Sequence, residues 1–112
     1  MNINPLIISA LDGIGCPVSP IKHDGAEDTY IVFYTYSESP ELFADDEEIG
    51  EVTYGTITIY SKGNFKALTK EVKNRLKQAG FVVRGSGPEG YEPDTGYYSY
   101  PIEICIEEGM EG

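Results

Sequence analysis

Apolar and polar residues alternate with two different periods along this chain, and each period predicts a type of element. A period of two predicts strands at 30–36, 52–60 and 97–107, with shorter strands at 18–21 and 81–84. A period near 3.6 predicts helices at 5–12 and 64–79. Their order predicts one α+β domain, in which a four- to five-stranded mixed or antiparallel sheet is packed by the helix of the C-terminal half and by a short N-terminal helix.

Both helices have sequence signals at their ends. Asn4 followed by Pro5 predicts the start of the first helix, because asparagine caps free backbone donors and proline suits the first turn. Asn64 is the predicted N-cap of the second helix, and Gly80 follows its C-terminus where left-handed backbone is favoured. The second helix has one apolar stripe, which we expect to pack on the sheet: Phe65, Leu68, Val72, Leu76 and Ala79.

The predicted strands differ in how their faces should be covered. Strand 30–36 carries bulky residues on both faces, which predicts a central strand buried on both sides. Strand 52–60 has one apolar face and one face of tyrosines and threonines that suits a contact but need not be buried. Pro101 lacks a backbone N–H, so the last strand is expected at an edge or with a bulge. The predicted buried face of that strand is Tyr98, Tyr100, Ile102, Ile104 and Ile106.

Charge is distributed unevenly. The segment 38–51 contains seven acidic residues around the apolar pair Leu42 and Phe43, and Pro40 lies inside it. Charge this dense predicts a solvated, flexible loop, which Leu42 and Phe43 would anchor to the core or to another subunit. The second helix carries the opposite charge on one flank, at helical spacing: Lys66, Lys70, Lys73 and Lys77.

Composition narrows the class of protein. A chain of 112 residues supports one modest core, and its net charge of −11 disfavours general binding to phosphate backbones, which depends on a positive surface. Acidity instead favours solubility or basic partners. Two cysteines are too few for a secreted disulfide framework, so we expect reduced thiols in a cytosolic setting. We also expect no signal peptide and no membrane-spanning segment.

No motif in the chain predicts catalysis, a cofactor or a metal. His23 lies in a polar loop beside Asp24, without a serine or cysteine nearby in sequence, and is expected to be a surface histidine. The acidic run 45–48 lacks the ligand spacing and central glycine of an EF-hand loop. The glycines around Ser86 precede a proline and not a helix, so they do not form a nucleotide-binding loop. We therefore expect a protein that is not an enzyme.

Three local sequences, together with the order of elements, carry a family resemblance. Gly63-Asn64 opens the second helix, Ala79-Gly80-Phe81 closes it, and Gly87-Pro88 leads to Tyr91-Glu92-Pro93-Asp94-Thr95-Gly96-Tyr97-Tyr98. With them the chain resembles, over nearly its whole length, the tail-completion proteins of long-tailed bacteriophages and prophages, the tail-terminator or tail-to-head joining family. The resemblance implies a non-enzymatic virion protein, made in the bacterial host cytoplasm, that forms a six-membered ring, caps the tail tube and docks to the head connector.

A ring of this kind joins two different patches on each subunit. We hypothesise that the lysine flank of one subunit meets the acidic segment of the next, and that these exposed ion pairs steer assembly more than they hold it together. An acidic wall would also let DNA pass without sticking, and no specific nucleic-acid binding is expected. The candidate interface residues are Lys66, Lys70, Lys73, Lys77, Leu42, Phe43, Asp45, Asp46, Glu47 and Glu48.

Two other functions fit the sequence. An acidic protein of this size can mimic DNA phosphates and occupy a basic site on a host enzyme; segment 38–51 favours this function, whereas the clustered lysines argue against it. Another neck component, such as a connector adaptor or a stopper, would share the location in the virion but contact different neighbours.

Overall fold

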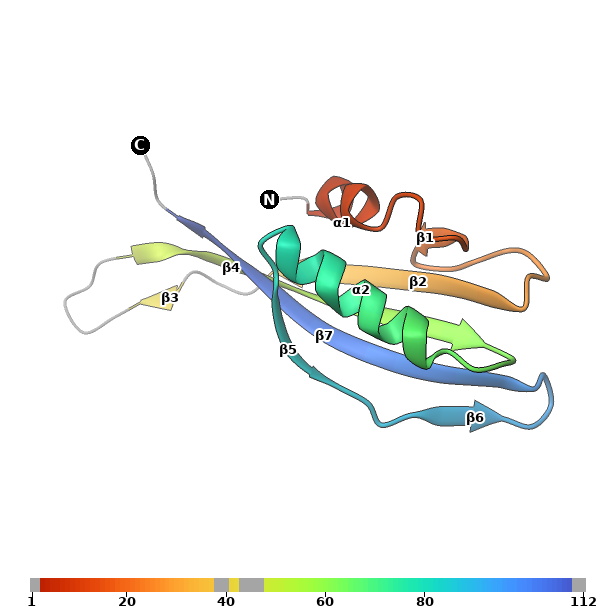
Figure 1. Cartoon of the computed structure of the whole chain (residues 1–112). Coiled ribbons are helices and arrows are strands. Elements are labelled where there is room, and N and C mark those ends of the chain that lie inside the picture. Colours follow the sequence, from red (N-terminus) through yellow and green to blue (C-terminus); the bar gives the residue numbers. More distant parts are fainter. Residues whose placement is uncertain (1–2, 38–40, 43–47, 110–112) are drawn as a thin grey trace.

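The computed structural model describes residues 3–37, 41–42 and 48–109, which form two layers: helices on one side and a sheet on the other (Figure 1). The helices are α1 (Asn4–Ala10) and α2 (Lys66–Gln78). The strands are β1 (Val18–Pro20), β2 (Thr29–Ser37), β3 (Glu41–Leu42), β4 (Glu48–Ser61), β5 (Val82–Ser86), β6 (Gly90–Glu92) and β7 (Tyr97–Gly109). The predicted α+β class, with a mixed sheet packed by helices, is confirmed.

Five strands form the main path of the sheet, in the order β1-β2-β4-β7-β5, while β3 adds to β4 and β6 adds to β7. β1 runs parallel to β2, and every other pair is antiparallel. β1 lies at an edge, where Pro20 can lack a backbone N–H without breaking a ladder on both sides. β4 and β5 both run antiparallel to β7 and are therefore parallel to each other, with α2 crossing between them. The two short strands β3 and β6 were not predicted.

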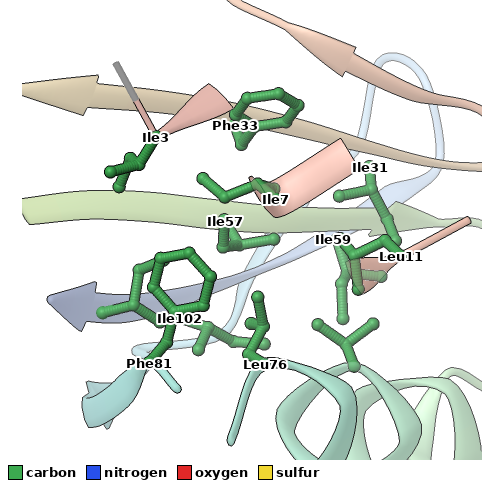
Figure 2. Close-up of a cluster of buried hydrophobic side chains, with 12 residues drawn as sticks. Ile3, Ile7, Leu11, Ile31, Phe33, Ile57, Ile59, Leu76, Phe81 and Ile102 are labelled. Carbon is green, nitrogen blue, oxygen red and sulfur yellow. The ribbon is translucent and has the colours of Figure 1, made fainter. Parts of the chain in front are cut away.

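Both helices pack on the same face of the sheet. Figure 2 shows the buried side chains of α1, α2 and the strands converging in one cluster. Its members are Ile3, Ile7, Leu11, Ile31, Phe33, Ile57, Ile59, Val72, Leu76, Phe81, Ile102 and Ile104. The prediction that β2 is buried on both sides is therefore wrong: Ile31 and Phe33 face the helices, whereas Tyr34 and Tyr36 on the other face are 49% and 43% exposed. Tyrosine tolerates this position because its ring is apolar and its hydroxyl is polar.

The helix ends differ from the prediction by one or two residues. α1 begins with Ile3 at the N-cap position, and Asn4 does not cap it but accepts a hydrogen bond from Thr35 Oγ1 on β2 (3.0 Å). Phe65 takes the N-cap position of α2, while Asn64 Oδ1 accepts the N–H of Lys66 (3.0 Å). Gly80 has the predicted left-handed backbone, with φ of 99°.

The predicted stripe of α2 is correct for Val72 and Leu76, which are buried, and for Phe65 and Leu68, which pack partly against the core. Ala79 is exposed, because it is the C-cap residue and the chain turns at Gly80. Thr69 takes the remaining buried position, with its Oγ1 donating to the Phe65 carbonyl (2.9 Å). A polar residue is tolerated there because this bond satisfies its hydroxyl.

β7 lies inside the sheet, so the expected edge position of Pro101 is wrong. Pro101 pairs with Thr58 of β4 on one side, and on the other side its carbonyl accepts the N–H of Gly87 (2.8 Å). Since the N–H and C=O of a strand residue point the same way, the missing donor of Pro101 faces the place where β5 has ended and β6 has not begun. The bulge lies in β5, where the register shifts between Val83 and Gly85.

Part of the predicted flexible loop 38–51 is strand. Leu42 of β3 pairs with Glu48 of β4, because antiparallel pairing satisfies the backbone donors and acceptors there. Figure 1 shows the start of β4 and the end of β7 extending past both helices, which accounts for the elongated dimensions of 52 × 26 × 23 Å. The candidate residues Phe43, Asp45, Asp46 and Glu47 lie outside the described residues.

Candidate interaction surfaces

The face of the sheet opposite the helices, here called the open face, is lined with tyrosine and threonine. Cross-strand register places Tyr30 opposite Tyr60 and Tyr36 opposite Tyr54. At the centre, Thr56 Oγ1 donates to Glu103 Oε1 of β7 (3.1 Å). The alternation in 52–60 predicted this amphipathic face, and the structure extends it over β2 and β7. Side chains paired in this way stabilise a sheet without a covering layer.

Aromatic rings and one arginine gather in one half of the open face. The ring centroids of Tyr34 and Tyr36 are 6.3 Å apart, and those of Tyr36 and Tyr54 are 5.9 Å apart. The Arg84 guanidinium lies over the Tyr54 ring, 4.7 Å from its centroid. A cation stacked on a ring is held in place while its outer face can still meet a partner. The surface is therefore a patch of preordered tyrosines beside a positive charge.

A second aromatic cluster lies in the other half of this face. His23 stacks on Tyr30 (4.4 Å between centroids), and Tyr30 stacks on Tyr60 (4.9 Å) and meets the edge of Tyr97 (5.4 Å). His23 Nε2 donates to Glu27 Oε1 (2.6 Å). The His23 side chain is only 9% exposed, so the expectation of a surface histidine is wrong, because the ring packs on tyrosine.

Two groups in this second cluster have shifted pKa values. The hydrogen bond from His23, together with one from the backbone, lowers the pKa of the Glu27 carboxyl. Burial raises the pKa of Tyr30, and the neighbouring Tyr97 and Tyr60 add to that effect. Both groups are thus held in their neutral-pH forms, a carboxylate and a phenol. The cluster anchors loop 21–28 to the sheet, since Tyr97 Oη also donates to the Glu27 carbonyl (2.6 Å).

A cavity of about 620 Å³ lies on the helix side of the sheet, where α2 begins. Phe65, Tyr98 and Tyr100 form its aromatic floor, with the Phe65 ring 6.1 Å from Tyr98 and 5.9 Å from Tyr100. Lys62 and Lys66 also line it, and Lys62 Nζ lies 4.9 Å from the centre of the Tyr97 ring. We call this site the aromatic pocket. It combines an apolar floor with positive charge, a combination that suits a ligand with an apolar group beside carboxylates.

Lys73 lies outside the lining of the aromatic pocket but contacts Tyr100 in its floor. Its Nζ donates to Ser86 Oγ (3.2 Å) and to Tyr100 Oη (3.4 Å), and it lies 5.4 Å from the centre of the Tyr100 ring. The Ser86 hydroxyl is 2.7 Å from Tyr100 Oη. These contacts lower the pKa of Tyr100, the hydrogen bond with Ser86 contributing most and Lys73 adding to it. Lys73 is thus engaged within the chain, whereas Lys66, Lys70 and Lys77 are exposed.

The start of the basic segment 62–78 and Glu48 lie at opposite ends of β4. Residues 62–78 hold six of the eight basic residues of the chain and only one acidic residue, Glu71. They directly follow the end of β4, whereas Leu42 and Glu48 lie at its start. Fourteen residues of strand span about 45 Å. Lys62 and Lys66, near the start of α2, are therefore far from Leu42 and Glu48 of their own chain, while α2 itself runs back along the sheet to β5.

Sequence reasoning missed the aromatic pocket, Arg84 and the cluster around His23. Lys62 and Phe65 come from the turn before α2, while Tyr98 and Tyr100 come from a strand more than thirty residues later. The sequence shows that Phe65, Tyr98 and Tyr100 are aromatic and that basic residues lie near Phe65, but it does not show that these residues come together.

No known protein family model matches this chain, and no curated protein matches it either. Neither helix among the described residues is long and apolar enough to cross a membrane. Within the same residues, histidine, cysteine and acidic side chains form no group of three or more that could hold a metal ion.

Proposed function

We propose that this chain is a structural virion assembly protein that caps the tail tube and joins the tail to the head connector in a long-tailed phage or prophage. The tyrosine-rich open face carries the proposal, because it offers Tyr34, Tyr36 and Arg84 on the face of the sheet that neither α1 nor α2 covers. Tyrosine and arginine are enriched where proteins meet, since they give large contact areas with a polar end. The family resemblance of the sequence supports the same role.

The chemistry of the open face favours a protein partner over a nucleic acid. A net charge of −11 opposes binding to phosphates, and most basic residues lie on the helix side. The proposed protein is not an enzyme and forms a homo-oligomer, a hexameric ring when assembled. An adaptor or stopper role in the same neck would use the same kind of surface.

The acidic mimic of DNA is the second candidate. The seven acidic residues of 38–51 favour it, because they follow one another closely without a basic residue between them. In that role the tyrosines of the open face would have no partner, which is why we rank it second.

The test is binding to purified tail-tube and head-connector proteins of the same phage or prophage. Replacing Tyr34 and Tyr36 together by serine should weaken binding to one of them by about tenfold or more, since interface tyrosines often dominate affinity. Ile8→Ser is the control, because Ile8 is a partly exposed apolar residue on α1. Circular dichroism should show that both variants fold.

Two results would reject the proposal. The first is equal binding by the tyrosine variant and the Ile8→Ser control. The second is a protein that ignores tube and connector proteins but displaces DNA from a nuclease, which would establish the acidic mimic.

A further inference from the structure

We infer that the aromatic pocket receives the acidic segment around Leu42 and Phe43 of a second copy of this chain, so that copies join end to end. This inference rests on the proposed function, because it names the surfaces through which the proposed oligomer forms. It goes beyond the hypothesis of a lysine flank by assigning the contact to one pocket with an apolar floor.

The pocket has the chemistry that this segment requires. Its floor is made of Phe65, Tyr98 and Tyr100, and it is also lined by two lysines and by one acidic residue, Glu89. Residues 42–48 present the complementary order, an apolar pair followed closely by four acidic residues. The aromatic side chain of the incoming segment, packed against this floor, would supply most of the affinity. The lysines would orient the carboxylates of the segment and increase the rate of association.

The occupant has to come from another copy. The pocket begins at Lys62, just after the end of β4, whereas Leu42 and Glu48 pair at the start of that strand. Figure 1 shows β3 and the end of β4 at opposite ends of the molecule. A strand of this length holds them about 45 Å apart, so the segment cannot fold back into its own pocket.

Two different patches at opposite ends make a heterologous contact. Such a contact repeats from copy to copy and either closes into a ring or continues as a filament. It leaves the open face of every copy uncovered, because that face lies along the side of the sheet and not at its ends.

The experiment uses complementary variants in sedimentation velocity, with and without tail-tube protein. A pocket variant, Lys62→Glu with Lys66→Glu, should lower self-association by about tenfold or more. The matched control is Lys70→Glu with Lys77→Glu, which makes the same charge change on exposed residues that do not line the pocket. It should associate at least several times more strongly than the pocket variant.

A segment variant, Phe43→Ser with Asp45→Asn and Asp46→Asn, should also lose self-association. Mixing it with the pocket variant should restore one contact per pair, between the intact segment of one and the intact pocket of the other. The mixture should therefore stop at a one-to-one dimer. Urea unfolding of each variant shows whether a loss of association merely reflects a loss of fold.

Three outcomes would overturn the inference: a pocket variant that associates like its control, a mixture that forms no dimer, and a chain that stays monomeric both alone and on the tail tube. The first two leave the proposed function intact if binding to tube and connector persists. Loss of that binding in the unaltered protein would reject the proposed function itself, so the two failures can be told apart.

Discussion

Two adjacent isoleucines on α1 allow a direct test of the fold. Ile7 is fully buried between the helices and the sheet (Figure 2), whereas Ile8 is 47% exposed. Ile7→Ala removes the same atoms as Ile8→Ala from the same short helix. The changes in helix propensity and in the unfolded chain are therefore nearly equal, and the difference between the variants reports burial.

The expected magnitudes are well separated. Ile7→Ala should lower the free energy of unfolding by about 2–5 kcal/mol, because it loses transfer energy and leaves a cavity. Ile8→Ala should change it by less than about 1 kcal/mol, since the side chain is half in water and alanine favours the helix. A domain of this size is stable by about 5–15 kcal/mol, so both variants should fold.

Urea unfolding followed by far-ultraviolet circular dichroism measures both values. Ile7→Val serves as a graded control and should cost about 0.5–1.5 kcal/mol. Equal losses of unfolding free energy in Ile7→Ala and Ile8→Ala would show that α1 does not pack on the sheet through Ile7. That result would also contradict the arrangement in which the helices cover one face of the sheet and leave the open face free.

Two further predictions concern single groups. Ser86→Ala removes the largest cause of the lowered Tyr100 pKa, so the pKa should rise toward the ordinary value of 10 in a tyrosinate absorbance titration. A pKa that is lower in the folded than in the unfolded state stabilises the fold at pH above the unfolded-state pKa, and this stabilisation is lost as the pH falls through the folded-state pKa. At neutral pH the variant and the unaltered protein should therefore have the same stability from this ionisation. An unchanged titration would contradict the role given to Ser86. Ile21 has φ of 71° at the centre of a tight turn and is 73% exposed, so Ile21→Gly should cost less than about 0.5 kcal/mol. The control is Val82→Gly, in ordinary strand backbone, which should lower the free energy of unfolding by about 0.5–1 kcal/mol. If urea unfolding gave equal losses for Ile21→Gly and Val82→Gly, backbone strain at Ile21 would be contradicted.

The sequence predicted those elements whose signal is local. The stripe of α2 and the glycine after it specify a helix within one segment, and the structure moves its start by only two residues. β6 was missed because a strand of three residues has almost no pattern of its own. Its pairing of Tyr91 with Tyr98 is set by the turn at Gly96, which a glycine-rich segment does not reveal in advance.

The covering of the sheet was mispredicted for a physical reason. Tyr34 and Tyr36 give β2 two bulky faces, but tyrosine is satisfied both in a core and beside water. Periodicity shows which residues share a face; it does not show whether a helix covers that face. Here both helices connect to the sheet from the same side, which only the assembled fold decides.

The separation of charge along β4 bears on how the proposed assembly would work. If the acidic segment and the lysines of one chain lay side by side, they would neutralise each other and leave no attraction for a neighbour. A rigid paired strand of fourteen residues prevents this, because neither end can bend back to the other. In the proposed assembly the attraction would act between copies, at the ends of each molecule. In the same proposal the open face, along the side of the sheet, would bind a different protein at the same time, so the proposed oligomer contacts and tube contacts would not compete for one surface.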